Sequence, residues 1–358
     1  MTVSPFDHPF LSGLLGNDEV AALFSADADI QMMLRFESAL AQAEAVEGVI
    51  PQEAAQRIAE VCSMFQPDMA SLASATARDG VVVPELVRQL RLAVGEPHGE
   101  HVHFAATSQD VIDTSLVMRL KQAIAVIERR IGEVGAKLAD LSAKDGHKAM
   151  IGRTRMRNAL QITAARRIRS WSEPLENSLN VLKSVQPGVL MLQFGGPVGM
   201  LQSLEDNGPK VARTLGEILD LDVPPHSWHE LRSGIARFAS WLSLVTGSLG
   251  KMGQDITLMA QDEIGEVILT EGGGSSVLTK KINPVRAEIL VALARFNAVQ
   301  LSAMHQSMVH ENERSGAAWT VEWMILPQMV VATAAALESA GRLLASIELQ
   351  HRTMDAAG

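Results

Sequence analysis

The chain has 358 residues, of which 47% are hydrophobic, enough for a large buried core in one to three domains. Its formal net charge of −10 provides no overall basic field of the kind that binds nucleic acid. Cys62 is the only cysteine, which excludes an internal disulfide and a thiolate metal cluster and suits a reducing compartment. No signal-peptide pattern and no run of about 18 apolar residues occur, so we expect a cytoplasmic protein without a membrane span.

Two helices are predicted near the N-terminus, over residues 28–48 and 52–64. They precede the segment HVHFAATSQDVID, from His101 to Asp113, which we expect to be a loop leading into a long helix. Thr107 and Ser108 occupy positions where Ser or Thr caps a helix, and the free N–H groups of a first turn can bind a carboxylate. These two residues therefore belong either to a substrate site or to an ordinary helix cap.

A long amphipathic helix is predicted next, because apolar residues recur at alternating steps of three and four. These residues are Val117, Leu120, Ile124, Ile127, Ile131, Val134, Leu138 and Leu141. At about 1.5 Å per residue such a helix is roughly 35–50 Å long, beyond the usual globular length. Its length predicts a helical bundle and is compatible with one shared between subunits.

The segment GRTRMRNALQIT, from Gly152 to Thr163, is predicted as a loop, and helices are predicted over residues 159–182 and 208–220. The loop contains Arg153, Arg155 and Arg157, whose spacing prevents neighbouring members from sharing a helix face. Arg155 is either an anion ligand or an ordinary solvated or ion-paired arginine.

A second long helix is predicted from another stripe of apolar residues at the same spacing. Its members are Ile235, Phe238, Leu242, Val245, Leu249, Met252, Ile256 and Met259. Further helices are predicted from Asn283-Pro284 to about His310, since Asn is a good N-cap and Pro suits the first helical position, and over residues 328–349. Alternating β-branched runs are almost absent, so the sequence predicts an all-α fold.

The third predicted loop, EGGGSSVLTKKINP from Glu271 to Pro284, lies between the second long helix and the helix predicted from Asn283-Pro284. Its glycine run can adopt conformations that other residues resist, so the loop could act as a hinged lid. The phosphate-binding pattern GxxxxGK[ST] is missing and no strand is predicted before the loop, which argues against a nucleotide site. The structural alternative is a linker with a C-cap glycine and an Asn N-cap.

All three loops contain motifs that resemble signatures of the fumarase/aspartase superfamily. The segment GSSVLTKKINP resembles G-S-S-x-M-P-x-K-x-N-P, with Leu278 and Thr279 in place of Met-Pro. The segment HFAATSQD resembles H-x-G-x-T-S-x-D, with Ala105 in place of Gly. The segment GRT resembles the start of G-R-T-H-x-Q, with Arg155 and Arg157 in place of His and Gln. Three motifs in this order are more specific than any one alone.

Within the superfamily, four stretches resemble the 3-carboxy-cis,cis-muconate cycloisomerase family, which also lacks the His of G-R-T-H. They are VHFAATSQDVIDTSL, LQFGGPVGMLQSL, SWHELRSGIARFA and HENERSGAAWTVEW. The resemblance implies a homotetramer built on a shared helical bundle, with each active site formed by three chains. It further implies an N-terminal helical domain over residues 1–106, a central long-helix bundle over 107–345 and, in 346–358, a remnant of a largely absent C-terminal domain.

The implied reaction is a cofactor-independent conversion of an open-chain tricarboxylate to its γ-lactone in aromatic catabolism. By resemblance, Ser275 transfers the proton, and Lys281 with the N-terminus of the helix after Asn283 provides the electropositive setting. Lys281 and Asn283 also hold a substrate carboxylate, and His103 acts either as an acid/base partner or as a support for the loop. The implied substrate-binding residues are Thr107, Ser108, Arg153, Thr154, Arg155, Ser276, Gln193 and Arg314. Our hypothesis is that Arg155 binds the 3-substituent bidentately. No metal site, nucleic-acid partner or membrane partner is expected.

Two other functions remain compatible with the sequence. One is a C–N lyase of the same superfamily, such as an enzyme acting on adenylosuccinate; the QFGG, WHELR and ENER stretches argue against it. The other is a catalytically silent member, suggested by Leu278, Thr279 and Arg155. The joint presence of Ser275, Lys281 and Asn283 argues against this second alternative, because a purely structural loop does not need all three.

Overall fold

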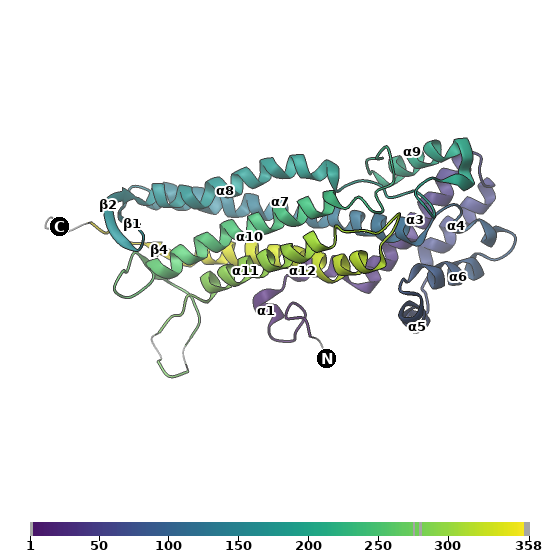
Figure 1. Cartoon of the computed structure of the whole chain (residues 1–358). Helices are drawn as coiled ribbons and strands as arrows, with labels where there is room; N and C mark the ends of the chain where they lie inside the picture. The colour runs from purple at the N-terminus through teal and green to yellow at the C-terminus, as the bar shows by residue number, and fades with distance from the viewer. Residues whose placement is uncertain (1–2, 275, 279–280, 354–358) are drawn as a thin grey trace.

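The computed structural model describes residues 3–274, 276–278 and 281–353, and these residues form an elongated helical protein (Figure 1). The helices are α1 (Ser12–Leu15), α2 (Asp18–Ala21), α3 (Ala26–Val46), α4 (Gln52–Met64), α5 (Met69–Asp79), α6 (Val83–Val94), α7 (Ser108–Asp145), α8 (Ala164–Val185), α9 (Gly208–Leu219), α10 (Ser233–Met259), α11 (Val285–Gln306) and α12 (Gly316–Ala345). Four short strands, β1 (Ala149–Thr154), β2 (Arg157–Thr163), β3 (Val267–Leu269) and β4 (Ile347–Leu349), form two antiparallel pairs. The predicted all-α class is confirmed.

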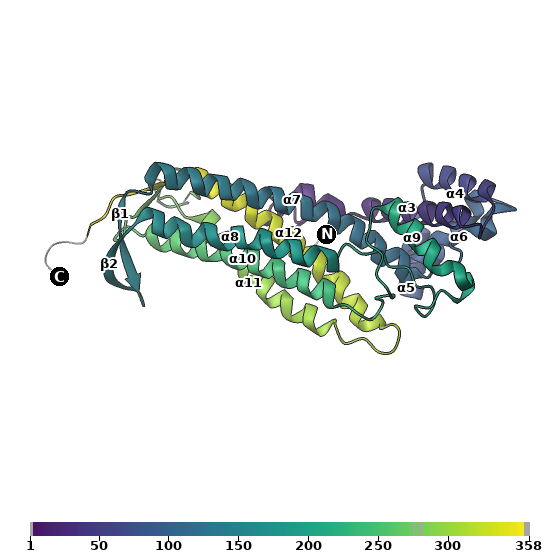
Figure 2. The same cartoon turned by 90° about the horizontal axis from the view of Figure 1, so that it is seen from above.

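The long helices α7, α8, α10, α11 and α12 run side by side as a bundle, as both views show (Figures 1 and 2). α10 packs against α8, α11 and α12, and α7 packs against α8 and α12. Every residue of the two predicted apolar stripes is buried, with an exposed fraction of 7% or less. The periodicity therefore identified the core-facing sides of α7 and α10 correctly, and their burial supplies much of the hydrophobic stabilisation of the bundle.

Two helices of the bundle, α11 and α12, are long and apolar enough to cross a membrane by length and composition alone. In α12, 61% of the most apolar window is buried inside the chain, as expected for the core helix of a bundle. In α11 only 28% is buried, and Val299 is among its exposed residues. α11 therefore presents an apolar surface that the described part of the chain does not cover.

Shorter helices gather at one end of the bundle, around the N-terminal part of α7. α3 packs against α4, α7 and α9, and α6 contacts α4, α5 and α7 (Figure 1). The opposite end carries the β1–β2 hairpin, the β3–β4 pair and the glycine-rich loop that precedes α11 (Figure 1). The two ends thus hold different sets of motif residues.

Two predicted helices have different boundaries in the structure. The helix predicted over residues 159–182 begins only at Ala164, because residues 157–163 pair with β1 as β2 and Thr163 accepts a hydrogen bond from the N–H of Arg166 as the cap of α8. The segment predicted as an irregular loop is therefore a hairpin. The helix predicted over 328–349 begins at Gly316, capped by Ser315, and continues through Pro327. It ends at Ala345, since residues 347–349 pair with β3 as β4.

The prediction that Asn283 caps the helix after the glycine-rich loop is wrong. α11 begins at Val285 with Pro284 as its N-cap residue, and it ends at Gln306 rather than His310. Asn283 pairs with Gly273 instead: the two residues exchange both backbone hydrogen bonds, at 3.0 and 2.8 Å. Asn283 therefore closes the base of the glycine-rich loop rather than the first turn of α11.

Glu44, near the end of α3, is a fully buried carboxylic acid without a hydrogen-bond partner for either carboxyl oxygen in the described part of the chain. Burial, with a smaller contribution from Glu37, raises the pKa of Glu44 to about 9. The folded protein therefore keeps this proton at neutral pH, whereas the unfolded chain releases it. Because the unfolded state binds fewer protons, Glu44 lowers stability progressively as the pH rises.

We expect Glu44→Gln to increase the free energy of unfolding relative to the wild type by an amount that grows with pH. The upper limit is about 1.4 kcal/mol per pH unit between the ordinary and the raised pKa of the group. Urea unfolding at pH 5 and pH 8, followed by circular dichroism at one protein concentration, measures the difference. An equal difference at both pH values would show that Glu44 is ionised in the folded protein.

Candidate active site

The first motif lies at the start of α7, which we call the α7 corner (residues 103–110). Thr107 is the N-cap residue, its backbone N–H donates to Asp110 Oδ2 at 3.0 Å, and the two residues form a capping box. The predicted cap is confirmed. Ser108 is the first helical residue, so the N–H groups of this turn point away from the helix, and they carry the positive end of the dipole of a 38-residue helix.

Asp110 joins this corner to two distant segments. Its carboxylate is fully buried and accepts hydrogen bonds from the backbone N–H groups of Gly195 (3.0 Å) and Gly196 (2.9 Å), and it contacts His229 Nε2 at 2.8 Å. Gly196 has a φ of +67°, and a Cβ there would lie 2.8 Å from the carbonyl oxygen of Ala105. Glycine is therefore required where the 193–197 turn packs on the α7 corner.

The remaining stretches of the resemblance meet in the same place. Gln193 is fully buried; its side chain donates to Ser227 Oγ at 2.8 Å and accepts from the N–H of Trp228 at 3.0 Å. Arg314 donates to Gln109 Oε1 at 2.9 Å and to the carbonyl oxygen of Pro197 at 3.2 Å. Gln193 thus supports the corner from behind, while Arg314 connects it to the loop before α12.

His103 is held against a buried acid. Its Nδ1 lies 2.7 Å from Glu37 Oε1 on α3. Burial alone would lower the pKa of His103, but the charge and hydrogen bond of Glu37, with the charge of Asp110, outweigh burial and the opposing charge of Arg91 and raise it. The corner therefore favours an imidazolium at His103.

The second motif forms the β1–β2 hairpin at the far end of α7. Arg153 donates to both carboxylate oxygens of the fully buried Glu266 at 2.9 Å, so its guanidinium anchors the hairpin to the bundle. Thr154 is exposed, and the turn is formed by Arg155 and Met156, with φ values of +49° and +66°. Two positive φ values are typical of a tight hairpin turn and present the Arg155 side chain to solvent.

The third motif is the glycine-rich loop, which we call the flap (residues 271–284). Ser275, with Thr279 and Lys280, lies outside the described residues. Ser276 and Lys281 are exposed, and the Lys281 ammonium has no hydrogen-bond or ion-pair partner within the described part of the chain. The Asn283 side chain donates to the carbonyl oxygen of Gly274 at 3.2 Å.

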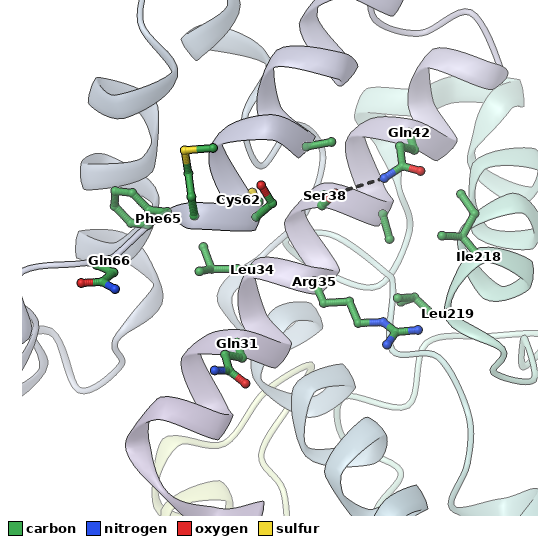
Figure 3. A pocket seen from close by; sticks show the side chains of 14 residues that line it. Gln31, Leu34, Arg35, Ser38, Gln42, Cys62, Phe65, Gln66, Ile218 and Leu219 are labelled. Carbon is green, nitrogen blue, oxygen red and sulfur yellow. Dashed lines mark hydrogen bonds between the residues drawn. The ribbon is translucent and has the colours of Figure 1, made fainter.

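One cavity lies beside the flap, and another lies away from the three motifs. One of about 1130 Å³ lies between the flap and the end of α10, and its lining includes Gln261, Leu278, Lys281 and Asn283. Figure 3 shows another, of about 580 Å³, between α3, α4 and α9, where Phe65 and Leu219 lie on opposite sides. None of the predicted site residues that the structure describes lines the second cavity, so we place the candidate site at the motifs.

Among the residues that the structure describes, the three motifs do not meet within one chain. α7 alone separates the α7 corner from the hairpin, and its 38 residues span about 57 Å at 1.5 Å per residue. The flap lies at the hairpin end of the bundle (Figure 1). One end of the bundle thus holds the predicted site residues His103, Thr107, Ser108, Gln193 and Arg314. The other end holds Arg153, Thr154, Arg155, Lys281 and Asn283.

Sequence reasoning missed three residues that organise the α7 corner. Asp110 stands in the first motif without an assigned role, and neither His229 nor Glu37 is among the predicted site residues. Asp110 was detectable as the third residue after the cap, where a carboxylate completes a capping box. Glu37 offered a weaker signal, as a charged residue on the apolar side of α3.

Comparisons with known proteins agree with these features. A family model described as Lyase matches residues 16–298. A 3-carboxy-cis,cis-muconate cycloisomerase of Pseudomonas aeruginosa is 37% identical over 339 residues, covering 93% of this chain and 74% of the relative. An N-acetyl-S-(2-succino)cysteine lyase of Enterococcus italicus is 32% identical, covering 94% of this chain and 74% of the relative.

A solved structure extends the comparison to the fold. The crystal structure of 3-carboxy-cis,cis-muconate lactonizing enzyme from Pseudomonas putida matches with a TM-score of 0.90 and 34% identity, over 96% of this chain and 77% of that one. The family match covers most of the bundle and the α7 corner, and the structural match covers nearly the whole chain. The chain therefore belongs to the lyase family and has the fold of the fumarase/aspartase superfamily.

Proposed function

We propose that the protein is a cycloisomerase that converts 3-carboxy-cis,cis-muconate to its carboxymuconolactone, a step of aromatic catabolism. The observation that carries this proposal is the 37% identity to a curated cycloisomerase over 93% of the chain, together with the α7 corner in which all four cycloisomerase-like stretches meet. Proteins that share a fold can catalyse different reactions, so the fold supports only membership of the family. The choice of reaction depends on the residues of the site.

The proposed reaction is an internal addition. A carboxylate oxygen of the substrate forms a C–O bond to one carbon of a conjugated double bond, and the adjacent carbon, beside another carboxylate, gains a proton. The substrate changes from three carboxylates to two and a lactone, and one proton is consumed. No electrons are exchanged with a second molecule, so the step needs no redox cofactor. The barrier falls when prearranged donors hold the enolate-like carboxylate that forms during the addition.

Each motif contributes a part of this chemistry. Ser275 delivers the proton from the flap, and Lys281 and Asn283 hold the substrate carboxylate at which negative charge develops. The first-turn N–H of Ser108, together with the hydroxyl groups of Thr107 and Ser108, binds a second carboxylate. Arg155 and Thr154 at the hairpin tip, with Ser276, bind the remaining carboxyl group, for which a planar guanidinium is a suitable bidentate donor. Arg153 and Gln193 hold the positions of these groups through Glu266 and Ser227.

Such a site requires more than one chain. The motifs lie at opposite ends of α7, and α11 exposes an apolar surface that a neighbouring copy can cover. We propose a homotetramer in which the long helices of four chains share one bundle and each site combines an α7 corner, a hairpin tip and a flap from three chains. In this arrangement the exposed Arg155 and Lys281 face the α7 corner of other chains.

Ultraviolet spectroscopy tests the proposal directly. We expect the protein to bleach the diene absorbance of 3-carboxy-cis,cis-muconate with a chelator present, and Ser275→Ala to reduce kcat by at least about 100-fold. Ser276→Ala is the matched control on the flap, with a smaller effect. Turnover of N-acetyl-S-(2-succino)cysteine or adenylosuccinate in place of the muconate would contradict the proposal, and full activity of Ser275→Ala would remove the proton-transfer role.

A further inference from the structure

Glu37 is a buried carboxylate at the α7 corner that the proposed reaction does not yet use. It is 2% exposed, and its Oε1 atom lies 2.7 Å from His103 Nδ1 although 66 residues separate the two in sequence. His103 has a φ of +62°, a left-handed conformation that is uncommon for a residue with a side chain. Surrounding contacts must offset the cost of this conformation, and the contact with Glu37 is one of them.

The second ring nitrogen of His103 is free for another partner. No hydrogen bond joins Nε2 to any described residue. The atom is also not buried, because it does not belong to the buried polar atoms without a partner. The His103 side chain is 14% exposed. When a carboxylate accepts from Nδ1–H, the ring keeps a defined orientation, and in the protonated ring Nε2 carries a hydrogen that can be donated.

The ionisable groups near the Glu37–His103 pair come from four elements. Glu37 on α3, Arg91 on α6 and Asp110 on α7 act on His103. Glu44 on α3 and Cys62 on α4 interact with Glu37. Burial raises the pKa of Glu44 to about 9 and that of Cys62 to about 12, so both are neutral at pH 7. Glu37 and Asp110 are the nearby anions.

These two anions differ in how directly they act on the imidazole. Asp110 is already occupied by the N–H groups of Gly195 and Gly196 and by His229. Arg91, the nearby cation, donates to the carbonyl oxygen of Val102 at 2.9 Å. Glu37 is therefore the anion in direct contact with His103.

We propose that Glu37 is a positioning residue: it holds the His103 imidazolium with Nδ1 inside the protein, so that Nε2–H is available to a carboxylate of the substrate. This role rests on the proposed function, because it concerns a donor in that site. It also gives His103 a defined part in the reaction, as a cationic donor to a polyanion rather than as a base, since Glu37 favours the protonated ring.

Two isosteric variants of α3 test this role. Glu37→Gln removes the charge beside His103, whereas Glu44→Gln is the matched control, a second buried acid of the same helix that is already neutral. We expect Glu37→Gln to lower the pKa of His103 by about 1–2 units and Glu44→Gln to leave it within a few tenths. NMR of protein with 13C-labelled histidine rings measures this pKa, with the His103 resonance identified by its loss in His103→Asn.

The activity readout is the pH profile of kcat/KM for 3-carboxy-cis,cis-muconate. The alkaline limb of the profile should move to lower pH with the His103 pKa in Glu37→Gln, and KM should rise more than kcat falls, because a ground-state carboxylate contact is weakened. Glu37→Asp keeps the charge but places it farther from His103. This variant should give intermediate values of the His103 pKa and of the alkaline limb of the profile. Glu44→Gln should keep the wild-type profile.

The two readouts separate the possible failures. An unchanged His103 pKa in Glu37→Gln overturns the inference whatever reaction the protein catalyses. A lowered pKa with an unmoved pH profile also overturns it, because His103 then does not serve the substrate, while the wild-type turnover still supports the proposed function. A wild-type protein that does not consume the muconate contradicts the proposed function itself and this role with it.

Discussion

A mixture of two inactive variants, His103→Asn and Lys281→Met, is expected to regain activity that neither has alone. Each substitution should lower kcat/KM by about 100- to 1000-fold, because Lys281→Met removes a cation that holds developing charge and His103→Asn removes a cationic donor to a substrate carboxylate. Asn suits position 103 because it tolerates the left-handed conformation found there. The two residues lie toward opposite ends of the bundle, so in the proposed homotetramer one site takes them from different chains.

Random mixing fixes the size of the recovery. When chains of both variants are unfolded together in urea and reassembled, about a quarter of the sites combine an intact α7 corner from one variant with an intact flap from the other. The mixture should therefore reach about a quarter of the wild-type rate. Measurement of the muconate absorbance against time, before and after reassembly, gives the recovered fraction.

A matched control uses two variants with lesions in the same motif. Lys281→Met mixed with Asn283→Ala should recover nothing, because every flap in the mixture carries one of the two substitutions. Recovery in this control, or none in the His103→Asn mixture, would show that the motifs do not combine across chains. The separation of the motifs along α7 would then require a different site.

The sequence predicted the parts of the fold that depend on local periodicity. The stripes of α7 and α10 were recognised because a helix repeats its buried face every three to four residues, and burial at those positions is nearly complete. The hairpin was not recognised, because Arg157–Thr163 is mostly exposed and lacks an apolar alternation. Its strands are specified by pairing with each other and by Arg153 bonding to Glu266, a contact across more than 100 residues.

The motifs of the site could be predicted from the sequence, but the residues that hold the motif side chains in position could not. Thr107 was recognised as a cap from sequence alone, since capping depends on residues within one turn. Glu37 and His229 reach the α7 corner only through tertiary packing, from α3 and from the segment before α10. A resemblance transfers residue types at matching positions, whereas the distances that orient His103 and Asp110 come from the fold.

A second large effect is expected in the core beside the α7 corner, where Arg232→Met should lower the free energy of unfolding by about 3–5 kcal/mol. Arg232 is fully buried and donates to both oxygens of Asp113, at 2.6 and 3.0 Å, and to both oxygens of Glu322, at 2.9 and 2.5 Å. Burial opposes its charge, but these two carboxylates hold the pKa of Arg232 above its ordinary value. Removing the guanidinium leaves two buried anions facing each other.

A surface arginine provides the control for this prediction. Arg129 also pairs with two carboxylates, Glu19 and Glu133, but its side chain is 50% exposed, so Arg129→Met should lower the free energy of unfolding far less than Arg232→Met does. Urea unfolding of both variants at the same protein concentration measures the two costs. Similar costs for the two variants would mean that the buried pairs are solvated in the folded protein.

The Arg232 network also bears on the site, because Asp113 accepts hydrogen bonds from Gln109 and from Trp319 Nε1, both at 3.0 Å. Gln109 in turn accepts from Arg314, so hydrogen bonds through the Asp113 carboxylate and the Gln109 amide connect Arg232 to the α7 corner. Arg232→Lys should therefore recover part of the stability but not the geometry, since an ammonium cannot bond both carboxylates bidentately. We expect this variant to fold and yet to bind the muconate more weakly than the wild type does.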